Sequence, residues 1–380
     1  MVLDSAGIGE MPDAAAWGDS GSDTIGHVVA AERPRLPSLR KLGLGNIHPM
    51  AFLPPVPDPE GAFGKAAIYS NGKDTTVGHW EMTGLVTPMP FPTYPNGFPD
   101  RILIPFQRAI GRNVLGNKAA SGTEIIRELG GEHVRTGKPI LYTSADSVFQ
   151  VAAHEEVIPL EELYRICLVA RQLLDGPDRV GRVIARPFVG EPGSFKRTGN
   201  RKDFAIPPPD KTLLDHLKNA GLATIGVGKI PSIFDFVGIS EHLEAHDNSQ
   251  SIDQTIRALG GAPEGLIFAN LVDFDMLWGH RRDSRGYAQA LESLDRRIPE
   301  IQRAMQRDDC LMITADHGCD PTYPGSDHTR EYVPILAYSK GLVGGVNLGI
   351  RSTLADMGQT IAENFGLHLS FGTSFLKDLV

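Results

Sequence analysis

The sequence predicts an α/β fold in which a mostly parallel central sheet carries helices on both faces. Two observations lead to this prediction. Short apolar runs rich in β-branched residues alternate with helix-like segments along most of the chain. Within each run the hydrophobic residues are continuous instead of alternating with polar ones. Continuous hydrophobicity is typical of strands that are covered on both sides, as the strands of a parallel sheet are.

The elements follow in chain order. After a short opening strand at 1–3, we expect further strands at 139–144, 181–188, 223–228, 265–274, 310–316 and 333–339. We expect helices at 121–131, 159–174, 210–221, 251–261, 287–307 and 352–366. Several of the helical segments begin with Ser, Thr or Asp and end on Gly, which are the residues that favour helix N-caps and C-caps.

The length of 380 residues is large for a single hydrophobic core, so two domains or a core with an insertion are expected. Two proline-rich stretches, 86–106 and 190–211, are suited to crossings between domains, although two long surface loops would have the same composition. We predict that residues 1–90 and 209–380 form one discontinuous catalytic core. Residues 91–208 are predicted to form a smaller α/β cap domain inserted into that core.

Composition narrows the class of protein. The content of 41% hydrophobic and 22% charged residues is typical of a soluble globular protein, and neither a membrane span nor a signal peptide is evident. The net charge of −9 disfavours nucleic acids and anionic membranes as partners, but a few local cations can still hold a small anionic substrate. The three cysteines, Cys167, Cys310 and Cys319, have no CxxC spacing. They indicate a reducing cytoplasm and disfavour a cysteine-built zinc site.

Acidic and imidazole side chains gather where predicted strands end. In an open parallel sheet, ligands bind beyond the carboxyl ends of the strands. Six side chains at or just after such ends are candidate metal ligands: Asp4, Asp275, His280, Asp316, His317 and His328. Any one of them alone could be a helix cap or an ordinary hydrogen-bonded histidine. Together they are enough for two divalent ions, and the mixture of carboxylates and imidazoles suits Mn²⁺ or Zn²⁺ better than Mg²⁺.

A candidate nucleophile lies in "YSNGKDTTVGHWEMTG" at 69–84. The hydroxyl of Thr75 would need a base or a metal ion to become reactive, and the N-terminus of a helix would favour a phosphate there. The alternative is that Asp74 to Thr76 simply cap a helix. Two other glycine-containing stretches, 43–47 and 226–229, lack the spacing of nucleotide-binding loops, so no nucleotide cofactor is expected.

Over nearly its whole length the chain closely resembles the phosphopentomutases of the alkaline phosphatase superfamily. The resemblance rests on motifs such as "GKDTTVGHWEM", "YTSADSVFQVAAHEE", "NLVDFDMLWGHRRD" and "ITADHGCDPTYPGSDHTREYVP". It implies an isomerase that transfers phosphate between the 1 and 5 positions of ribose or 2-deoxyribose, through a phosphothreonine enzyme and a bisphosphate intermediate. It also implies two metal ions, usually manganese, an alkaline phosphatase-like core with an inserted cap, and a sugar bisphosphate as activator.

The resemblance also implies roles for individual residues. One ion would be held by Asp275, His280 and His328, and the other by Asp4, Asp316 and His317. Thr75 matches the phosphorylated nucleophile, and Asp327 would orient its neighbour. The residues that match contacts to the sugar phosphate are Ser144, Asp146, Arg182 and Lys229.

Two departures from the family pattern affect these expectations. Only three residues precede Asp4, fewer than the five or six of a typical strand, so weakened metal binding by Asp4 is expected. Val77 replaces a threonine that is common in the family, with a mild expected effect, and Cys319 is expected to pack without binding metal. Alternative functions are a metal-dependent phosphatase or a phosphoglycerate-type mutase on the same core. A further alternative is a sugar-phosphate binding protein that lacks turnover because of the short strand.

Overall fold

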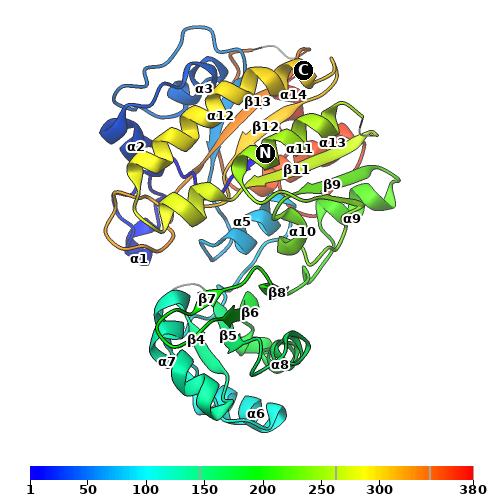
Figure 1. Cartoon of the computed structure of the whole chain (residues 1–380). Coiled ribbons are helices and arrows are strands. Elements are labelled where there is room, and N and C mark those ends of the chain that lie inside the picture. Colours follow the sequence, from blue (N-terminus) through cyan, green and yellow to red (C-terminus); the bar gives the residue numbers. More distant parts are fainter. Residues whose placement is uncertain (145–146, 262, 342–343, 380) are drawn as a thin grey trace. The chain divides into compact units, whose positions relative to one another are not determined.

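A computed structural model describes all residues except 145–146, 262, 342–343 and 380 (Figure 1). The chain divides into two compact units, which we call unit 1 (Met1–Met89 with Pro207–Val380) and unit 2 (Pro90–Ile206). Both divisions fall inside the two proline-rich stretches of the sequence. Within the described residues, no helix combines the length and the apolar character that crossing a membrane requires.

Unit 1 is built on a sheet that has eight strands among the described residues. Their spatial order is β10 (Glu241–Leu243), β9 (Ala223–Val227), β11 (Gly265–Leu271), β1 (Val2–Leu3), β12 (Leu311–Thr314), β13 (Val333–Tyr338), β2 (Ala62–Ala66) and β14 (Asn347–Arg351). Neighbours run parallel except at β13, which is antiparallel to β12 and to β2. The predicted α/β class with a mostly parallel sheet is therefore confirmed.

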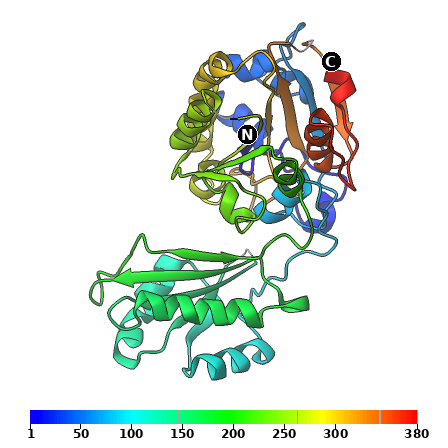
Figure 2. The same cartoon turned by 90° about the vertical axis from the view of Figure 1, so that its right-hand side faces the viewer.

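Helices cover both faces of this sheet, as Figure 2 shows. One packed group consists of α2 (Thr24–Glu32), α3 (Pro37–Leu42), α11 (Asn248–Leu259) and α12 (Ser284–Ala304). The other consists of α5 (Thr75–Met82), α9 (Leu213–Asn219), α10 (Ile230–Ile233) and α13 (Ala355–Asn364). Short helical turns complete the unit: α1 (Ala14–Trp17), α4 (Leu44–Ile47), α14 (Leu376–Leu379) and the π-turn η2 (Phe274–Gly279).

The two-residue strand β1 lies in the middle of the sheet, between β11 and β12. Val2 pairs with residues of both neighbours, and its side chain is fully buried. The amino terminus of Met1 donates a hydrogen bond to the carbonyl of Met312 at 2.9 Å, and the Met1 carbonyl accepts one from the Thr314 N–H at 3.1 Å. Short as it is, the strand is fixed from both sides, and Asp4 follows it directly into the interior.

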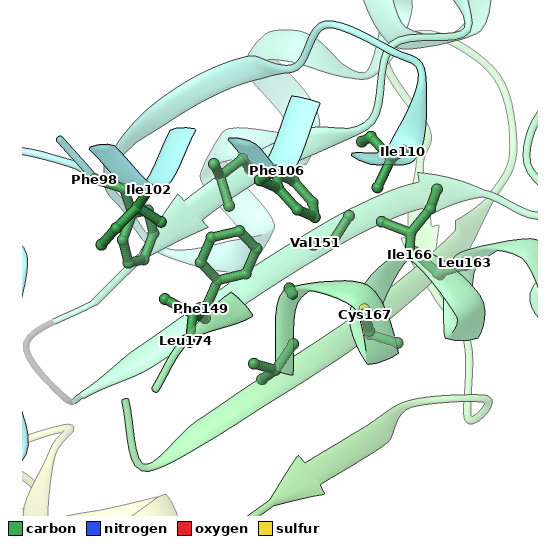
Figure 3. Close-up of a cluster of buried hydrophobic side chains, with 14 of the residues drawn as sticks. Phe98, Ile102, Phe106, Ile110, Phe149, Val151, Leu163, Ile166, Cys167 and Leu174 are labelled. Carbon is green, nitrogen blue, oxygen red and sulfur yellow. The ribbon is translucent and has the colours of Figure 1, made fainter. Parts of the chain in front are cut away.

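Unit 2 has a mixed sheet of six strands in its described part. The strands are β3 (Leu115–Ala119), β4 (Ile140–Thr143), β5 (Val148–His154), β6 (Arg182–Val189), β7 (Lys196–Arg197) and β8 (Lys202–Ala205). The helices are α6 (Asp100–Ile110), α7 (Gly122–Thr136), α8 (Leu160–Leu173) and the short 3₁₀ turn η1 (Gly176–Asp178). In the core drawn in Figure 3, Phe149 of β5 meets Phe106 of α6 edge-on, with 4.9 Å between the ring centroids. The unit therefore has a hydrophobic core of its own.

Helix α7 corrects one prediction from the sequence. We expected the helix to end at the glycine pair 130–131, but it continues to Thr136 and ends at Gly137, which has φ +69°. Gly130 is needed for packing: a Cβ there would lie 2.5 Å from the ring of Phe195. A Cβ on Gly131 would meet nothing within 4 Å. The sequence pattern alone could not separate a glycine that permits close contact from one that ends a helix.

These two neighbouring glycines give a matched test of packing. We expect Gly131→Ala to stabilise the protein by about 0.5–1 kcal/mol, because alanine removes the entropic cost of a helical glycine. Gly130→Ala should destabilise it, because the added methyl group collides with Phe195. Urea denaturation of both variants measures the difference. Equal stabilisation by both substitutions would contradict the packing role of Gly130.

Candidate functional site

The order of the strands brings the predicted ligands together. β11, β1 and β12 are parallel neighbours, so their carboxyl ends lie at one edge of the sheet. Asp4 follows β1, Asp275 lies in η2 after β11, and Asp316 and His317 follow β12. His280 is the C-cap of η2. The sixth predicted ligand, His328, comes from the loop that leads into β13.

One group of ligand atoms comprises Asp4, Asp316 and His317, and all three residues are fully buried. His317 Nε2 lies 3.4 Å from Asp4 Oδ1 and 3.4 Å from Asp316 Oδ2. The Ser5 N–H donates to Asp316 Oδ1 at 3.0 Å, which leaves Oδ2 turned toward the histidine. On the other side of the ring, His317 Nδ1 donates to the carbonyl of Gly318 at 3.1 Å. This backbone contact aims Nε2 at the carboxylates, an arrangement that is common for metal-binding histidines.

The other ligand atoms centre on Asp275, which groups with His317 and His328 and, separately, with His280 and Cys319. Its Oδ2 lies 3.4 Å from His280 Nε2, and its Oδ1 lies 3.3 Å from His328 Nε2. His280 Nδ1 donates to the carbonyl of Ser326 at 2.7 Å, so Nε2 is the nitrogen presented to the carboxylate. The two groups adjoin, because the rings of His317 and His328 are 4.0 Å apart between centroids. All six ligands predicted from the sequence thus lie in one cluster.

The donor atoms of this cluster fit a divalent metal ion. Asp275 Oδ1, Asp316 Oδ2 and His328 Nε2 are buried and have no hydrogen-bond partner in the described part of the chain. Buried polar atoms without partners are costly, and native proteins rarely leave them so. Cations bound at the Asp316 group and at the Asp275 group would satisfy all three. Carboxylate oxygens and imidazole nitrogens together suit a divalent ion of the first transition row.

The charges of the cluster balance one another. Burial alone would raise the pKa of Asp4 and of Asp275. Lys229 lowers the pKa of Asp4 below its usual value, and His280 does the same for Asp275. Burial would lower the pKa of His317, but the carboxylates around it raise that pKa to about 10. The His317 imidazolium and Lys229 thus offset the carboxylate charge, and a metal ion bound here would displace the imidazolium proton.

Cys319 lies beside the cluster. Its sulfur is 3.9 Å from His280 Nδ1, the nitrogen that donates to Ser326, and 3.7 Å from the carbonyl of Asp327. The sulfur also lies within 4.8 Å of ligand atoms of Asp275 and His280. Burial raises the pKa of Cys319 to about 12, which keeps the sulfur protonated. That Cys319 packs without binding metal stays a prediction from the sequence.

Thr75 is the first residue of α5, and its hydroxyl points into the cluster. Thr75 Oγ1 lies 3.4 Å from Asp4 Oδ1 and 3.4 Å from His317 Nε2. The capping role suggested by the sequence belongs to Asp74, whose Oδ1 accepts from the N–H groups of Thr76 and Val77 at 2.9 and 3.1 Å. The helix cap and the candidate nucleophile are thus different residues. The Thr75 hydroxyl therefore has no capping role and is available as a nucleophile.

The loop before Thr75 is held by two buried charged residues. Glu81 of α5 accepts hydrogen bonds from the backbone N–H groups of residues 69 and 70, at 2.8 and 2.6 Å, and from the Thr353 hydroxyl at 2.7 Å. Arg330 donates to the carbonyls of residues 68, 70 and 72 at 2.7–2.9 Å. Each charge is therefore spread over several backbone groups. Together they fix the path of the chain into the nucleophile turn.

The four predicted substrate contacts are distributed over both units. Lys229 is the N-cap residue of α10 in unit 1, and its Nζ lies 3.2 Å from Asp4 Oδ2. In unit 2, Ser144 follows β4, and Arg182 begins β6 with its Nη1 3.8 Å from Asp203 Oδ2. Asp146 lies outside the described residues. Lys229 therefore contacts the metal-ligand cluster through Asp4.

Two buried residues of this cluster were missed by the sequence reasoning. His79 of α5 has its Nδ1 2.8 Å from the Thr75 carbonyl, and Asn270 of β11 has its Nδ2 3.1 Å from Asp4 Oδ2. His79 lies inside a helix, and Asn270 is the last residue but one of β11, within its apolar run. A polar residue within a buried helix or strand is the feature of the sequence that could have identified them.

Behind the cluster, Glu331 joins the loops that follow β1 and β12. Its carboxyl accepts from the Thr24 N–H and hydroxyl and from the Thr329 hydroxyl, at 2.6–2.8 Å. Gly7 and Gly318 leave room for it, since a Cβ on either would lie 2.4 Å from a Glu331 oxygen. Burial raises the pKa of Glu331 from about 4.5 to about 8.

This carboxyl predicts a dependence of stability on pH. Between pH 4.5 and 8 the folded protein keeps the Glu331 proton while the unfolded chain has lost it, so stability falls as pH rises. We expect Glu331→Gln, whose amide can donate to the same hydroxyls, to lose less stability than the parent between pH 5 and pH 8. Urea denaturation of both proteins with chelator present measures this difference. An equal or larger loss in the variant would contradict the assignment.

Comparisons with known proteins bear on this site. The model of the metalloenzyme superfamily matches residues 1–369. A curated phosphopentomutase of Caldanaerobacter subterraneus subsp. tengcongensis is 57% identical over 380 residues, covering 100% of this chain and 97% of that protein. Another from Desulfitobacterium hafniense is 57% identical over 382 residues, covering 100% and 98%. Among solved structures, a phosphoglycerate mutase of Leishmania mexicana aligns over 98% of this chain and 96% of its own, at 13% identity and a TM-score of 0.49, which is too low to inform function.

Proposed function

Because the chain belongs to the phosphopentomutase family, within the metalloenzyme superfamily, we infer that it is an isomerase that interconverts ribose 1-phosphate and ribose 5-phosphate, and their 2-deoxyribose equivalents. The observation that carries this inference at the level of chemistry is the position of one hydroxyl. Thr75 Oγ1 lies 3.4 Å from Asp4 Oδ1 and from His317 Nε2, inside a cluster of metal-ligand side chains.

The protein binds divalent metal. We propose two ions, manganese by preference, because six ligands are available and half of them are imidazoles. One ion would be held by Asp275, His280 and His328, and the other by Asp4, Asp316 and His317. When bound, such ions neutralise the charge of a transferring phosphoryl group.

We propose that Thr75 carries a phosphoryl group in the active enzyme. Thr75 gives this group to the free hydroxyl of the sugar phosphate, which becomes a bisphosphate, and then accepts the other phosphoryl group in return. Each half of the exchange breaks one P–O bond and forms another, so no free phosphate is produced. Burial supports the proposal, because Thr75 is only 5% exposed and water has little access to its hydroxyl.

Substrate binding is proposed for four side chains. Lys229 would neutralise a phosphate, as its charge and its place beside Asp4 suggest. Ser144, Asp146 and Arg182 are assigned to the sugar phosphate on the family resemblance. The partners proposed are pentose phosphates and an activating sugar bisphosphate that phosphorylates Thr75. A cytoplasmic location is proposed on the three cysteines, each of which is free in the described part of the chain.

An assay of products tests the function. Incubation with ribose 5-phosphate and Mn²⁺ should yield ribose 1-phosphate with little inorganic phosphate. Release of inorganic phosphate would identify a metal-dependent phosphatase. Turnover of phosphoglycerate but not of ribose 5-phosphate would identify a phosphoglycerate-type mutase. Calorimetric binding of ribose 5-phosphate without any turnover would identify a binding protein.

A further inference from the structure

His79 is a fully buried histidine that the proposed chemistry does not use. It lies on α5, one helical turn after Thr75. Its Nδ1 is 2.8 Å from the Thr75 carbonyl and 3.1 Å from Asp316 Oδ2. Its Nε2 is 3.2 Å from Asn270 Nδ2. The ring therefore has a partner at each nitrogen, and each partner leads to the candidate centre.

The partners fix the protonation of the ring. A backbone carbonyl can only accept, so Nδ1 must carry the hydrogen that it donates to Thr75. Asn270 Nδ2 also donates to Asp4 Oδ2 at 3.1 Å, which fixes the orientation of the amide, so Nε2 must be the acceptor of its second hydrogen. Nδ1 is accordingly the donor and Nε2 the acceptor in these two hydrogen bonds. A continuous chain of hydrogen bonds runs from Asp4 through Asn270 and His79 to the Thr75 backbone.

The two N–H donors of its side-chain amide explain why asparagine occupies position 270. Its side chain is fully buried in β11, and its Oδ1 has no hydrogen-bond partner among the described residues. A buried acceptor without a partner is unfavourable, so an apolar residue would serve a purely structural strand better. The amide nitrogen accounts for the choice of asparagine here, because it contacts both Asp4 and His79.

We propose that His79 is a positioning residue. With Asn270 it sets the backbone turn of the nucleophile relative to Asp4 of one metal site, through the amide, while its ring packs beside Asp316 of the same site. The proposal rests on the proposed function, and it adds a link between that nucleophile and the proposed ligands. Outer contacts of this kind orient the groups that bind metal and tune their affinity.

Two substitutions of His79 separate positioning from packing. His79→Phe keeps a ring against Phe268, whose centroid lies 5.8 Å away, but loses both hydrogen bonds. His79→Asn keeps a donor near the position of Nδ1. We expect His79→Phe to bind Mn²⁺ about 10–100-fold more weakly and to lose kcat by about the same factor, with KM for ribose 5-phosphate nearly unchanged. His79→Asn can keep the bond to the Thr75 carbonyl but not the one to Asn270, so it should recover part of both losses.

The control is a second buried histidine in unit 2. His133 bonds to the Lys138 carbonyl and to the His154 N–H, at 2.7 and 2.8 Å, and its ring lies 5.6 Å from Phe188. His133→Phe should lower the midpoint of thermal unfolding but leave kcat and Mn²⁺ affinity as in the parent. A loss of Mn²⁺ affinity equal to that of His79→Phe would show that any buried histidine has this effect, and would overturn the proposal.

Mn²⁺ affinity is measured by calorimetric titration without substrate, so this readout does not depend on turnover. Parent-like Mn²⁺ binding by His79→Phe would overturn the proposal, as would a His79→Asn variant as impaired as His79→Phe. If His79→Phe does not fold, Asn270→Ala provides the test, with about tenfold weaker Mn²⁺ binding expected and unchanged binding against the proposal. Absence of mutase activity in the parent would count against the proposed function alone, since the titration still tests His79.

Discussion

Thr75→Ala is expected to reduce the interconversion of ribose 5-phosphate and ribose 1-phosphate by at least about a thousandfold in kcat, because the group that accepts and returns the phosphoryl is removed. The variant should also fail to acquire phosphate when it is incubated with a sugar bisphosphate. Coupled assays and mass spectrometry of the peptide that contains Thr75 measure the two effects. Metal binding should persist, since Thr75 is not among the six proposed ligands.

Neighbouring substitutions make this test specific. Thr75→Ser keeps a hydroxyl and should retain measurable turnover. Thr76→Ala removes the next hydroxyl along the helix, while the backbone N–H of residue 76 still bonds to Asp74. It should leave turnover close to that of the parent. Normal activity in Thr75→Ala, or an equal loss in Thr76→Ala, would remove the basis for a phosphothreonine enzyme.

Asp275→Asn is the second change with a large expected effect. Asp275 is the carboxylate beside the rings of His280 and His328, with one oxygen near the Nε2 of each. The amide has the same shape but no negative charge, and its nitrogen cannot bind a cation. We expect Mn²⁺ affinity to fall at least about a hundredfold and turnover to be lost at moderate Mn²⁺ concentration. Calorimetric titration and the isomerisation assay measure both.

Asp273→Asn is the matched control, two residues earlier in the chain. Asp273 is also buried, but its Oδ2 accepts from the Asn248 N–H at 2.8 Å, at the start of α11. It therefore supports a helix end and is not part of the ligand cluster. The variant should bind Mn²⁺ and turn over as the parent does. Loss of metal in Asp273→Asn, or its retention in Asp275→Asn, would refute the assignment of the carboxylates.

The sequence predicts the strands that form the middle of the main sheet better than those at its edge. β9, β11, β12 and β13 are continuous apolar runs, and burial on both faces demands that pattern. The edge strand β14 reads "NLGIR" and its neighbour β2 reads "AFGKA". Because each contains a glycine and a charged residue, neither strand stands out in the sequence as an apolar run. The direction of β13 was also beyond prediction, because an antiparallel strand buried on both faces has the same composition as a parallel one.

The candidate site also contains some residues that the sequence predicts and others that it does not. Its six proposed ligands could be predicted because hydrophilic residues at the ends of apolar runs are conspicuous and a parallel sheet gathers them. His79 and Asn270 could not, since they lie inside a helix and a strand and act through bonds to residues 75 and 4. Their partners are fixed by tertiary packing alone. Spacing along the chain carries no signal of such contacts.

The place of β1 between β11 and β12 has a consequence for biosynthesis. Ser5 bonds to a residue 311 positions later, so the strand and its partners leave the ribosome roughly 15–60 s apart at about 5–20 residues per second. β2 likewise pairs with β13 and β14, which are synthesised much later. Unit 2 is continuous in the chain and meets no such delay. We expect stalled nascent chains to protect 90–206 from protease early, while residues 1–89 stay cleavable until β14 has been synthesised.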